Sequence, residues 1–107
     1  MTLIIPHHKT QQEVIGIIDR GWTDVFAGIA GGLVEIVDQT KAWNGSTMSF
    51  GFTGRVGFIS IPLTGTVEVD DRNVTVQCEL PPMVKNFLGE DKVGSGITER
   101  MKGLLSA

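Results

Sequence analysis

The chain of 107 residues has little of the chemistry that catalytic and metal sites usually require, since it contains one cysteine and two histidines. A single cysteine, Cys78, cannot form an internal disulfide, which is typical of a reducing compartment. No stretch approaches the roughly 18 apolar residues that a membrane span needs, and the N-terminal run Leu3, Ile4 and Ile5 is far shorter than a signal-peptide core. The sequence therefore predicts a cytoplasmic protein without a membrane span.

Clusters of positive charge are also missing. Nine Lys and Arg residues are scattered along the chain against twelve Asp and Glu, which gives a net charge of -3. Proteins that bind nucleic acids usually concentrate basic residues on one face, so the composition indicates no nucleic-acid partner. A hydrophobic content of 41% with 20% charged residues is ordinary for a globular protein of this length. We therefore expect one domain spanning residues 1–107.

Residues 10–30 predict a long amphipathic helix. Thr10 and Glu13 have the spacing of a capping box, in which each residue bonds the other at the start of a helix. Apolar residues then recur every three or four positions, as they do along one face of a helix, at Val14, Ile18, Trp22, Val25 and Ile29. Such a helix is about 30 Å long, which suits a helix laid across a sheet. We expect Trp22 to lie in the core.

The segment between residues 33 and 80 predicts four antiparallel strands. Its apolar residues alternate with polar ones, and the eleven residues from Ile59 to Val69 keep one parity that no helical period can produce. Turn sequences at Asn44-Gly45 and at residues 70–73 join successive strands, which requires antiparallel pairing. Cys78 falls on the apolar face of the last strand, so we expect a buried and unreactive thiol.

The two ends of the chain are less regular. Residues before the long helix predict a short strand or arm, and Pro82 can occupy the first turn of a helix over the residues that follow. From residue 90 onward the apolar spacing is helical, but Gly89, Gly94 and Gly96 predict one broken helix or two short ones. The fold class is therefore α+β, with the long N-terminal helix packed on one face of a mainly antiparallel four-stranded sheet and a C-terminal helical segment.

No catalytic, cofactor or metal site is predicted. His7 and His8 are adjacent in an extended arm, so their side chains point to opposite sides and are poorly placed to share a metal. The acidic pairs Asp70-Asp71 and Glu90-Asp91 fall in predicted turns, where acidic residues are common. The glycines lack the spacing of a dinucleotide fingerprint or a phosphate loop. We therefore expect no enzyme activity and no cofactor.

Phe58 and Pro62 form the candidate partner contact. Phe58 has the parity of Ser60 and Pro62, which places it on the sheet face opposite the helix. An exposed Phe beside a Pro can form a partner patch, although a single exposed apolar residue needs no explanation. An open sheet also has edges whose main-chain groups are available for pairing. The sequence therefore predicts a homodimer, or a complex with another protein, formed through Phe58 and Pro62 or the sheet edge beside them.

The sequence as a whole combines a helix after an "I-x-x-x-H" motif, the segment GRVGFISIPLTGTVEVDDRNVTVQCELP and a terminal helix with Lys, Arg and Leu. In this it resembles the small bacterial family of polyhydroxyalkanoic acid system proteins, which are encoded near polyester-granule genes. The resemblance implies a non-enzymatic accessory role, with the granule surface as a partner. It carries over no site residue.

Two functions follow from these observations. The first is a binding or accessory module that presents its surface to a protein partner or to the apolar surface of a polyhydroxyalkanoate granule. The second is a small carrier that binds an acyl or other apolar ligand between helix and sheet. A co-purifying small ligand would favour the carrier, and a stoichiometric protein partner would favour the module.

Overall fold

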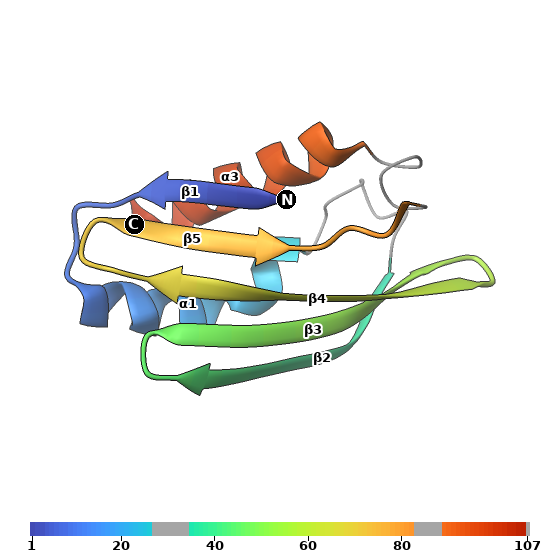
Figure 1. Cartoon of the computed structure of the whole chain (residues 1–107), viewed down its shortest axis with the longest axis horizontal. Helices are drawn as coiled ribbons and strands as arrows, with labels where there is room; N and C mark the ends of the chain where they lie inside the picture. The colour runs from blue at the N-terminus through green and yellow to red at the C-terminus, as the bar shows by residue number, and fades with distance from the viewer. Residues whose placement is uncertain (27–34, 83–88, 107) are drawn as a thin grey trace.

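The structure is a computed structural model that describes residues 1–26, 35–82 and 89–106. Within these residues the chain forms an antiparallel sheet with two helices on one of its faces (Figure 1). The elements follow in the order β1 (Thr2–Pro6), α1 (Gln11–Phe26), β2 (Glu35–Asn44), β3 (Thr47–Val56), β4 (Ile59–Val69), β5 (Asn73–Cys78) and α3 (Glu90–Leu105). The α+β class predicted from the sequence is therefore confirmed.

The sheet has five strands in the order β1-β5-β4-β3-β2, and every neighbouring pair is antiparallel. Strands β2 to β5 form the predicted meander, but the prediction of four strands is wrong by one. The additional strand is β1, which pairs Leu3 with Val76 and Ile5 with Val74. Because β1 is short and its partner lies far along the chain, no local turn sequence connects the two and sequence periodicity could not reveal the pairing.

Helix α1 begins where the capping box predicts. The Thr10 hydroxyl accepts the backbone N–H of Glu13 at 3.2 Å and donates to the Glu13 carboxylate at 3.1 Å. These bonds satisfy a helix-start donor that would otherwise be unpaired. The described helix runs to Phe26, and the predicted continuation over residues 27–30 lies outside the described residues.

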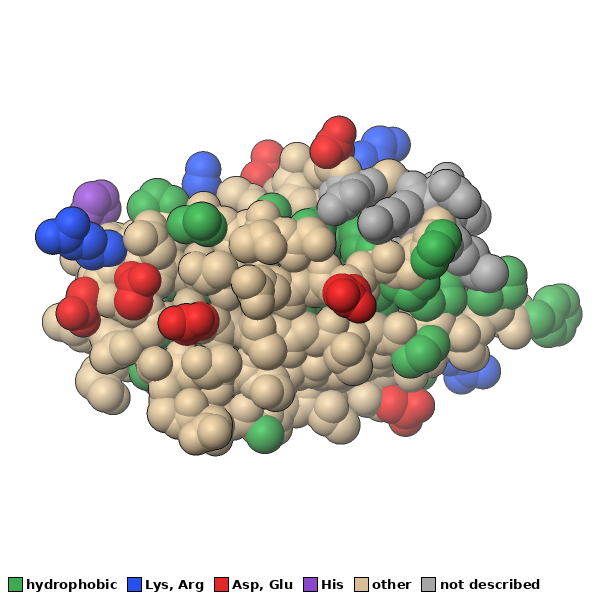
Figure 2. All heavy atoms as spheres, in the orientation of Figure 1, with side chains coloured by type: hydrophobic (Ala, Val, Ile, Leu, Met, Phe, Trp, Pro, Cys, Tyr) green, Lys and Arg blue, Asp and Glu red, His purple; other side chains and the backbone are tan. Residues whose placement is uncertain are grey.

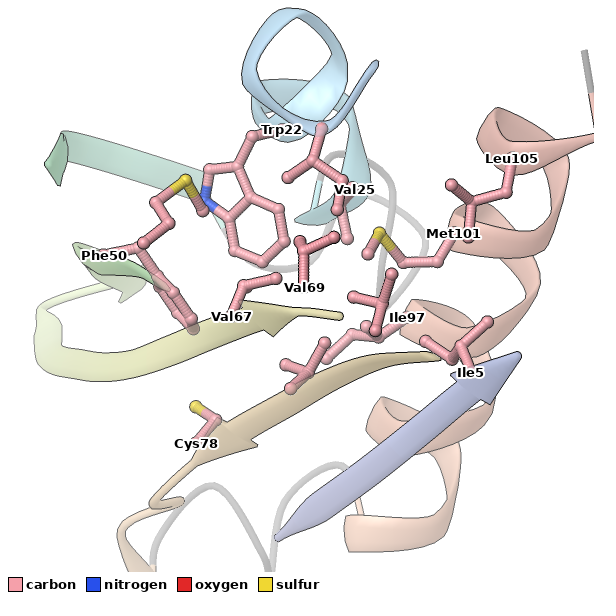
Figure 3. Packing of buried hydrophobic residues seen from close by; sticks show 14 of the residues in the cluster. Ile5, Trp22, Val25, Phe50, Val67, Val69, Cys78, Ile97, Met101 and Leu105 are labelled. Atoms are coloured by element: carbon pink, nitrogen blue, oxygen red, sulfur yellow. The ribbon is translucent and has the colours of Figure 1, made fainter. Parts of the chain in front are cut away.

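The core lies between the two helices and the sheet (Figure 3). Trp22 is 5% exposed, and its ring centroid lies 4.7 Å from that of Phe50 on β3. Phe50 in turn covers Gly65 of β4, where an added Cβ would lie 2.6 Å from the Phe50 ring. The predicted core position of Trp22 is therefore confirmed, and only glycine at residue 65 leaves room for the Phe50 ring.

Helix α3 is continuous over sixteen residues, so the prediction of a broken helix is wrong. Its buried residues are Val93, Ile97, Met101 and Leu105, which lie one turn apart and pack on the sheet. Burial of four apolar side chains outweighs the cost of about 1 kcal/mol that each interior glycine adds. Gly94 lies against Leu3 of β1, where an added Cβ would be 3.3 Å from the Leu3 side chain. The helix predicted after Pro82 falls on residues 83–88, outside the described part of the chain.

Strand β2 changes parity at a β-bulge. Its register with β3 shifts between Val37 and Thr40, where Asp38 has a φ of 55°. After the bulge, the Trp43 indole N–H donates to Asp19 Oδ1 of α1 at 2.9 Å, and Lys41 Nζ lies 3.0 Å from the same oxygen. The hydrogen bonds from Lys41 and Trp43 hold the pKa of Asp19 below its ordinary value of 3.8. This contact ties α1 to the edge strand of the sheet.

Candidate contact surface

The hairpin of β3 and β4 extends beyond β5 and β1, while β2 pairs with β3 as far as Arg55. Pairing between β4 and β5 covers only the residues from Gly65 to Val69, whereas β3 and β4 stay paired as far as Val56 and Ile59. The molecule measures 42 × 23 × 21 Å, and the hairpin forms one end of its long axis (Figure 1). The two strands therefore carry their connecting turn past the helices.

This turn, which we call the hairpin tip, consists of Gly57 and Phe58 between the paired residues Val56 and Ile59. Gly57 has a φ of 61°, a conformation that glycine adopts without strain. The Phe58 side chain is fully exposed, at 106% of its reference area, and Ile59 is 46% exposed. Figure 2 shows hydrophobic side chains gathered at this end of the molecule.

Phe58 does not occupy the position that the sequence predicted. The parity argument placed it on the outer sheet face with Ser60 and Pro62, but the structure places it in the turn itself. The prediction failed because it extended the parity of β4 one residue before Ile59, into the turn where the chain reverses direction. The exposure of Phe58 and Pro62 is nevertheless as expected, and their contact with a partner stays a prediction.

At Pro62, β4 pairs with β3 on one side, and no described strand pairs with it on the opposite side. The Val69 N–H donates to Ser46 O at 2.9 Å, so odd-numbered residues of β4 direct their main-chain groups toward β3. Main-chain hydrogen-bonding directions alternate along a strand, so even-numbered residues such as Pro62 face the side of β4 that has no neighbouring strand here. Proline has no N–H, so this position lacks the donor that an added strand would need. A proline at such a position blocks the addition of another strand. A partner at this residue must therefore use side-chain contacts.

The hairpin tip has little net charge beside it. Arg55 on β3 pairs in register with Glu35 on β2, so one positive and one negative residue flank the tip. The net charge of the whole chain is -3, which opposes rather than favours attraction to an anionic surface. The tip is therefore suited to an apolar, uncharged partner surface.

The two histidines have different surroundings, and the structure does not bring them together as metal ligands. His7 is 7% exposed, and its Nδ1 accepts the Lys9 N–H at 3.2 Å while its Nε2 donates to Asp70 O at 2.9 Å. His8 is exposed. Among the described residues no group of three or more His, Cys, Asp or Glu side chains is placed to hold a metal. His7 links β1 to the turn between β4 and β5.

The two acidic pairs lie in different local structures, one in a turn between strands and the other at the start of a helix. Asp70 Oδ1 accepts the N–H of Arg72 at 2.7 Å and of Asn73 at 2.6 Å, as predicted for a turn residue. These two hydrogen bonds hold the pKa of the Asp70 carboxyl below its ordinary value of 3.8. Glu90 and Asp91 were also predicted to lie in a turn, but they form the first turn of α3. Asp91 is exposed in this first turn, where an acidic side chain is favourable because the start of a helix carries partial positive charge.

Cys78 is buried, with 4% of its area exposed, which confirms its predicted place on the apolar face. Burial raises the pKa of its thiol, because the thiolate would lose its hydration there. Low reactivity stays a prediction. We expect thiol reagents to label Cys78 slowly in the folded chain and rapidly in denaturant, and rapid labelling of the folded chain would contradict this.

Sequence reasoning missed two exposed apolar residues, Ile4 at 64% and Ile59 at 46%. A signal for Ile4 was present, because adjacent strand residues point to opposite faces and Leu3, Ile4 and Ile5 cannot all enter one core. For Ile59 the parity was correct. It lies beyond the part of the sheet where buried residues such as Leu63 begin, so its exposure depends on tertiary structure alone.

Comparison of the chain with protein-family models, curated proteins and solved structures found no match. Within the described residues, no helix is both long and apolar enough to cross a membrane.

Proposed function

We propose that the protein is a non-enzymatic binding protein that attaches to an apolar surface through the hairpin tip. The observation that carries this proposal is the full exposure of Phe58 at the end of a hairpin that extends past both helices. The surface of a polyhydroxyalkanoate granule is the partner that the family resemblance implies. The protein would act there as an accessory component.

The main chain of the tip suits contact with an apolar medium. Val56 and Ile59 are paired across the hairpin, and only Gly57 and Phe58 lie between them. Few main-chain groups would therefore lose hydrogen bonds to water when the tip becomes buried, and unpaired buried groups are the main cost of such contact. Phe58 can enter an apolar surface before the rest of the molecule reaches it.

The size of the apolar contact predicts reversible attachment. Burial of a Phe side chain contributes about 2–3 kcal/mol, and the exposed half of an Ile adds about 1 kcal/mol. The sum is smaller than the binding that a single myristoyl anchor provides, which is itself marginal and reversible. The hairpin tip alone would therefore hold the protein weakly, and several molecules or a second contact would be needed for stable attachment.

Sedimentation with polyhydroxyalkanoate particles tests this proposal. We expect the wild-type chain to sediment with the particles and Phe58→Asp to lower the bound fraction at least about tenfold, since a charge at the tip opposes burial. Ser49→Asp is the matched control, because Ser49 is exposed on β3 far from the tip and receives the same charge. Equal binding of the two variants, or no binding by the wild type, would refute the proposal.

The other expectations stay predictions. The carrier function would require an acyl or other apolar ligand between helix and sheet, where Trp22 and Phe50 are in contact. Native mass spectrometry of protein purified from its host would reveal such a ligand. A protein partner at Phe58 and Pro62 is likewise a prediction, which a pull-down from the host can test. The cytoplasmic location also stays a prediction.

A further inference from the structure

The described part of the sheet has three open strand edges, and two of them are protected against pairing. On β4 the open stretch contains Pro62, which lacks an outward N–H. On β2 the edge is interrupted by the bulge at Asp38 and carries Lys41, and both features discourage strand addition. The edge of β1 has neither a bulge nor a charged residue, and its one proline, Pro6, is the last residue of the strand.

The main-chain groups of Thr2 and Ile4 point away from the sheet. Met1 exchanges two hydrogen bonds with Cys78, each 3.0 Å long, and the His7 N–H donates to Arg72 O at 2.8 Å. Odd-numbered residues of this segment therefore face β5, and alternation directs the N–H and C=O of Thr2 and Ile4 outward. Both residues are exposed, Ile4 to 64%. A strand could add to β1 without displacing any bond of the sheet.

A groove of about 610 Å³ runs beside this edge, between β1 and α3. Leu3 contributes an apolar wall, and Gly94 and Ser95 on α3 are short enough to keep the groove open. Asp91 lines the groove near the start of α3, and Glu99 and Lys102 line it two and three helical turns further on. In Figure 1, β1 and α3 run in the same direction along one side of the molecule.

We infer that this side is the interface of a homodimer, in which β1 pairs antiparallel with β1 of a second copy. A two-fold axis at Leu3 places Thr2 opposite Ile4 of the second copy and Ile4 opposite its Thr2. These two pairs exchange four main-chain hydrogen bonds, and the two sheets become one. The two Leu3 side chains meet over the groove.

The charges on α3 favour a second copy as the occupant. Because α3 runs parallel to β1, the same axis reverses α3 and places Asp91 of one copy opposite Lys102 of the other. The point midway between these residues lies beside Gly96, within one turn of the Gly94 that contacts Leu3. An axis near this point brings Asp91 of each copy toward Lys102 of the other, so that two ion pairs can form between the copies, with Glu99 one turn from Lys102 on the same helix. A foreign strand would share the main-chain bonds but would match these charges only by coincidence.

This dimer differs from the one predicted at Phe58 and Pro62, and it does not depend on the proposed function. Dimerisation uses β1 and α3, whereas surface attachment uses the hairpin tip at another part of the molecule (Figure 1). Phe58→Asp should therefore leave the dimer intact, and variants on α3 should leave the hairpin tip intact. The failure of one proposal is thus distinguishable from the failure of the other.

Sedimentation velocity over a range of concentrations tests the dimer with a charge exchange. We expect Asp91→Lys and Lys102→Asp each to raise the dissociation constant about tenfold or more, because two attractive pairs become repulsive. The double variant should restore dimerisation, because the two charges then face each other in exchanged positions. Lys92→Asp is the matched control, since Lys92 is exposed on the same helix but does not line the groove. A double variant no better than the single ones would contradict the inference.

A second pair of variants tests the strand. Ile4→Pro removes the outward N–H and should abolish the dimer, while Ile4→Thr keeps the N–H and should retain it. Thermal unfolding and far-UV circular dichroism check that both variants are folded. A wild-type chain that is monomeric at every soluble concentration would overturn the inference. It would equally be overturned by a dimer that survives Ile4→Pro but dissociates in Phe58→Asp, which would place the interface at the hairpin tip.

Discussion

Strands β3 and β4 keep one alternating pattern of residues along their length, but one end of the pair lies beneath the helices and the other end is exposed. At the covered end, Met48, Val67 and Val69 are at most 1% exposed beneath the helices. At the hairpin end the alternation of β4 continues to Ile59, yet Ile59 is 46% exposed, and Phe58 in the turn beside it is fully exposed. The difference shows that alternation determines which face a residue occupies. Whether that face is buried depends on what lies over it.

The two ends therefore differ in what their residues contribute. At the covered end each apolar side chain stabilises the fold through burial, so substitutions there should change the free energy of unfolding. At the hairpin tip an apolar side chain gains little from folding and is available for a partner. Substitutions at the covered end should therefore change stability more than substitutions at the hairpin tip.

Trp22→Ala should produce the largest loss, because the indole is 5% exposed and packs against Phe50. We expect the free energy of unfolding to fall by about 3–5 kcal/mol, the usual range for truncation of a large core residue. Chemical denaturation of the two proteins measures this difference. A loss below about 1 kcal/mol would show that Trp22 does not anchor α1 on the sheet.

Sequence periodicity predicted the elements with long and regular patterns. The capping box fixed the start of α1, and the parity of Ile59 to Val69 gave the bounds of β4 without error. It failed where tertiary contacts decide the outcome. Gly94 and Gly96 weaken helix propensity, yet α3 is continuous because its buried stripe packs on the sheet.

The candidate contact surface was predictable only in part. Composition and parity identified Phe58 as exposed, but the turn at Gly57 lacks the Asn-Gly sequence typical of tight hairpins, so the position of Phe58 was misjudged. The open edge of β1 could not be predicted at all. Its existence depends on pairing between Leu3 and Val76, which no local sequence signal encodes.

Gly65→Ala should cause the next largest loss. Gly65 lies at the covered end beneath the Phe50 ring, where an added Cβ would collide with the backbone carbonyl oxygen of Gln77 on β5 and lie 2.6 Å from the ring. We expect a loss of about 1–3 kcal/mol, as for other overpacked sites. Gly103→Ala is the control, because nothing lies within 4 Å of a Cβ at this helical position and a gain of up to about 1 kcal/mol is expected. Equal effects of the two variants would contradict the tight packing at Gly65.

Asp70 should make a smaller contribution that depends on pH. Its folded pKa is lowered, first by the Arg72 N–H and then by the Asn73 N–H. The stabilisation is therefore complete above the ordinary value of 3.8 and is lost as pH falls through the lowered folded pKa. Asp70→Asn keeps an acceptor oxygen but does not titrate in this range. The stability difference between wild type and Asp70→Asn should shrink on acidification below 3.8, and a constant difference would contradict the assignment.

Phe58→Asp should have the smallest effect on stability. The side chain is fully exposed, so the folded state loses almost no buried area when it is replaced, and a change within about 0.5 kcal/mol is expected. Phe52→Asp is the contrasting variant, because Phe52 lies on β3 of the same hairpin but is 7% exposed and would bury an unpaired charge. Chemical denaturation of both variants therefore compares the two ends of one hairpin directly. A loss above about 1 kcal/mol in Phe58→Asp would show that Phe58 packs against the protein itself, and the hairpin tip would no longer be available to a partner.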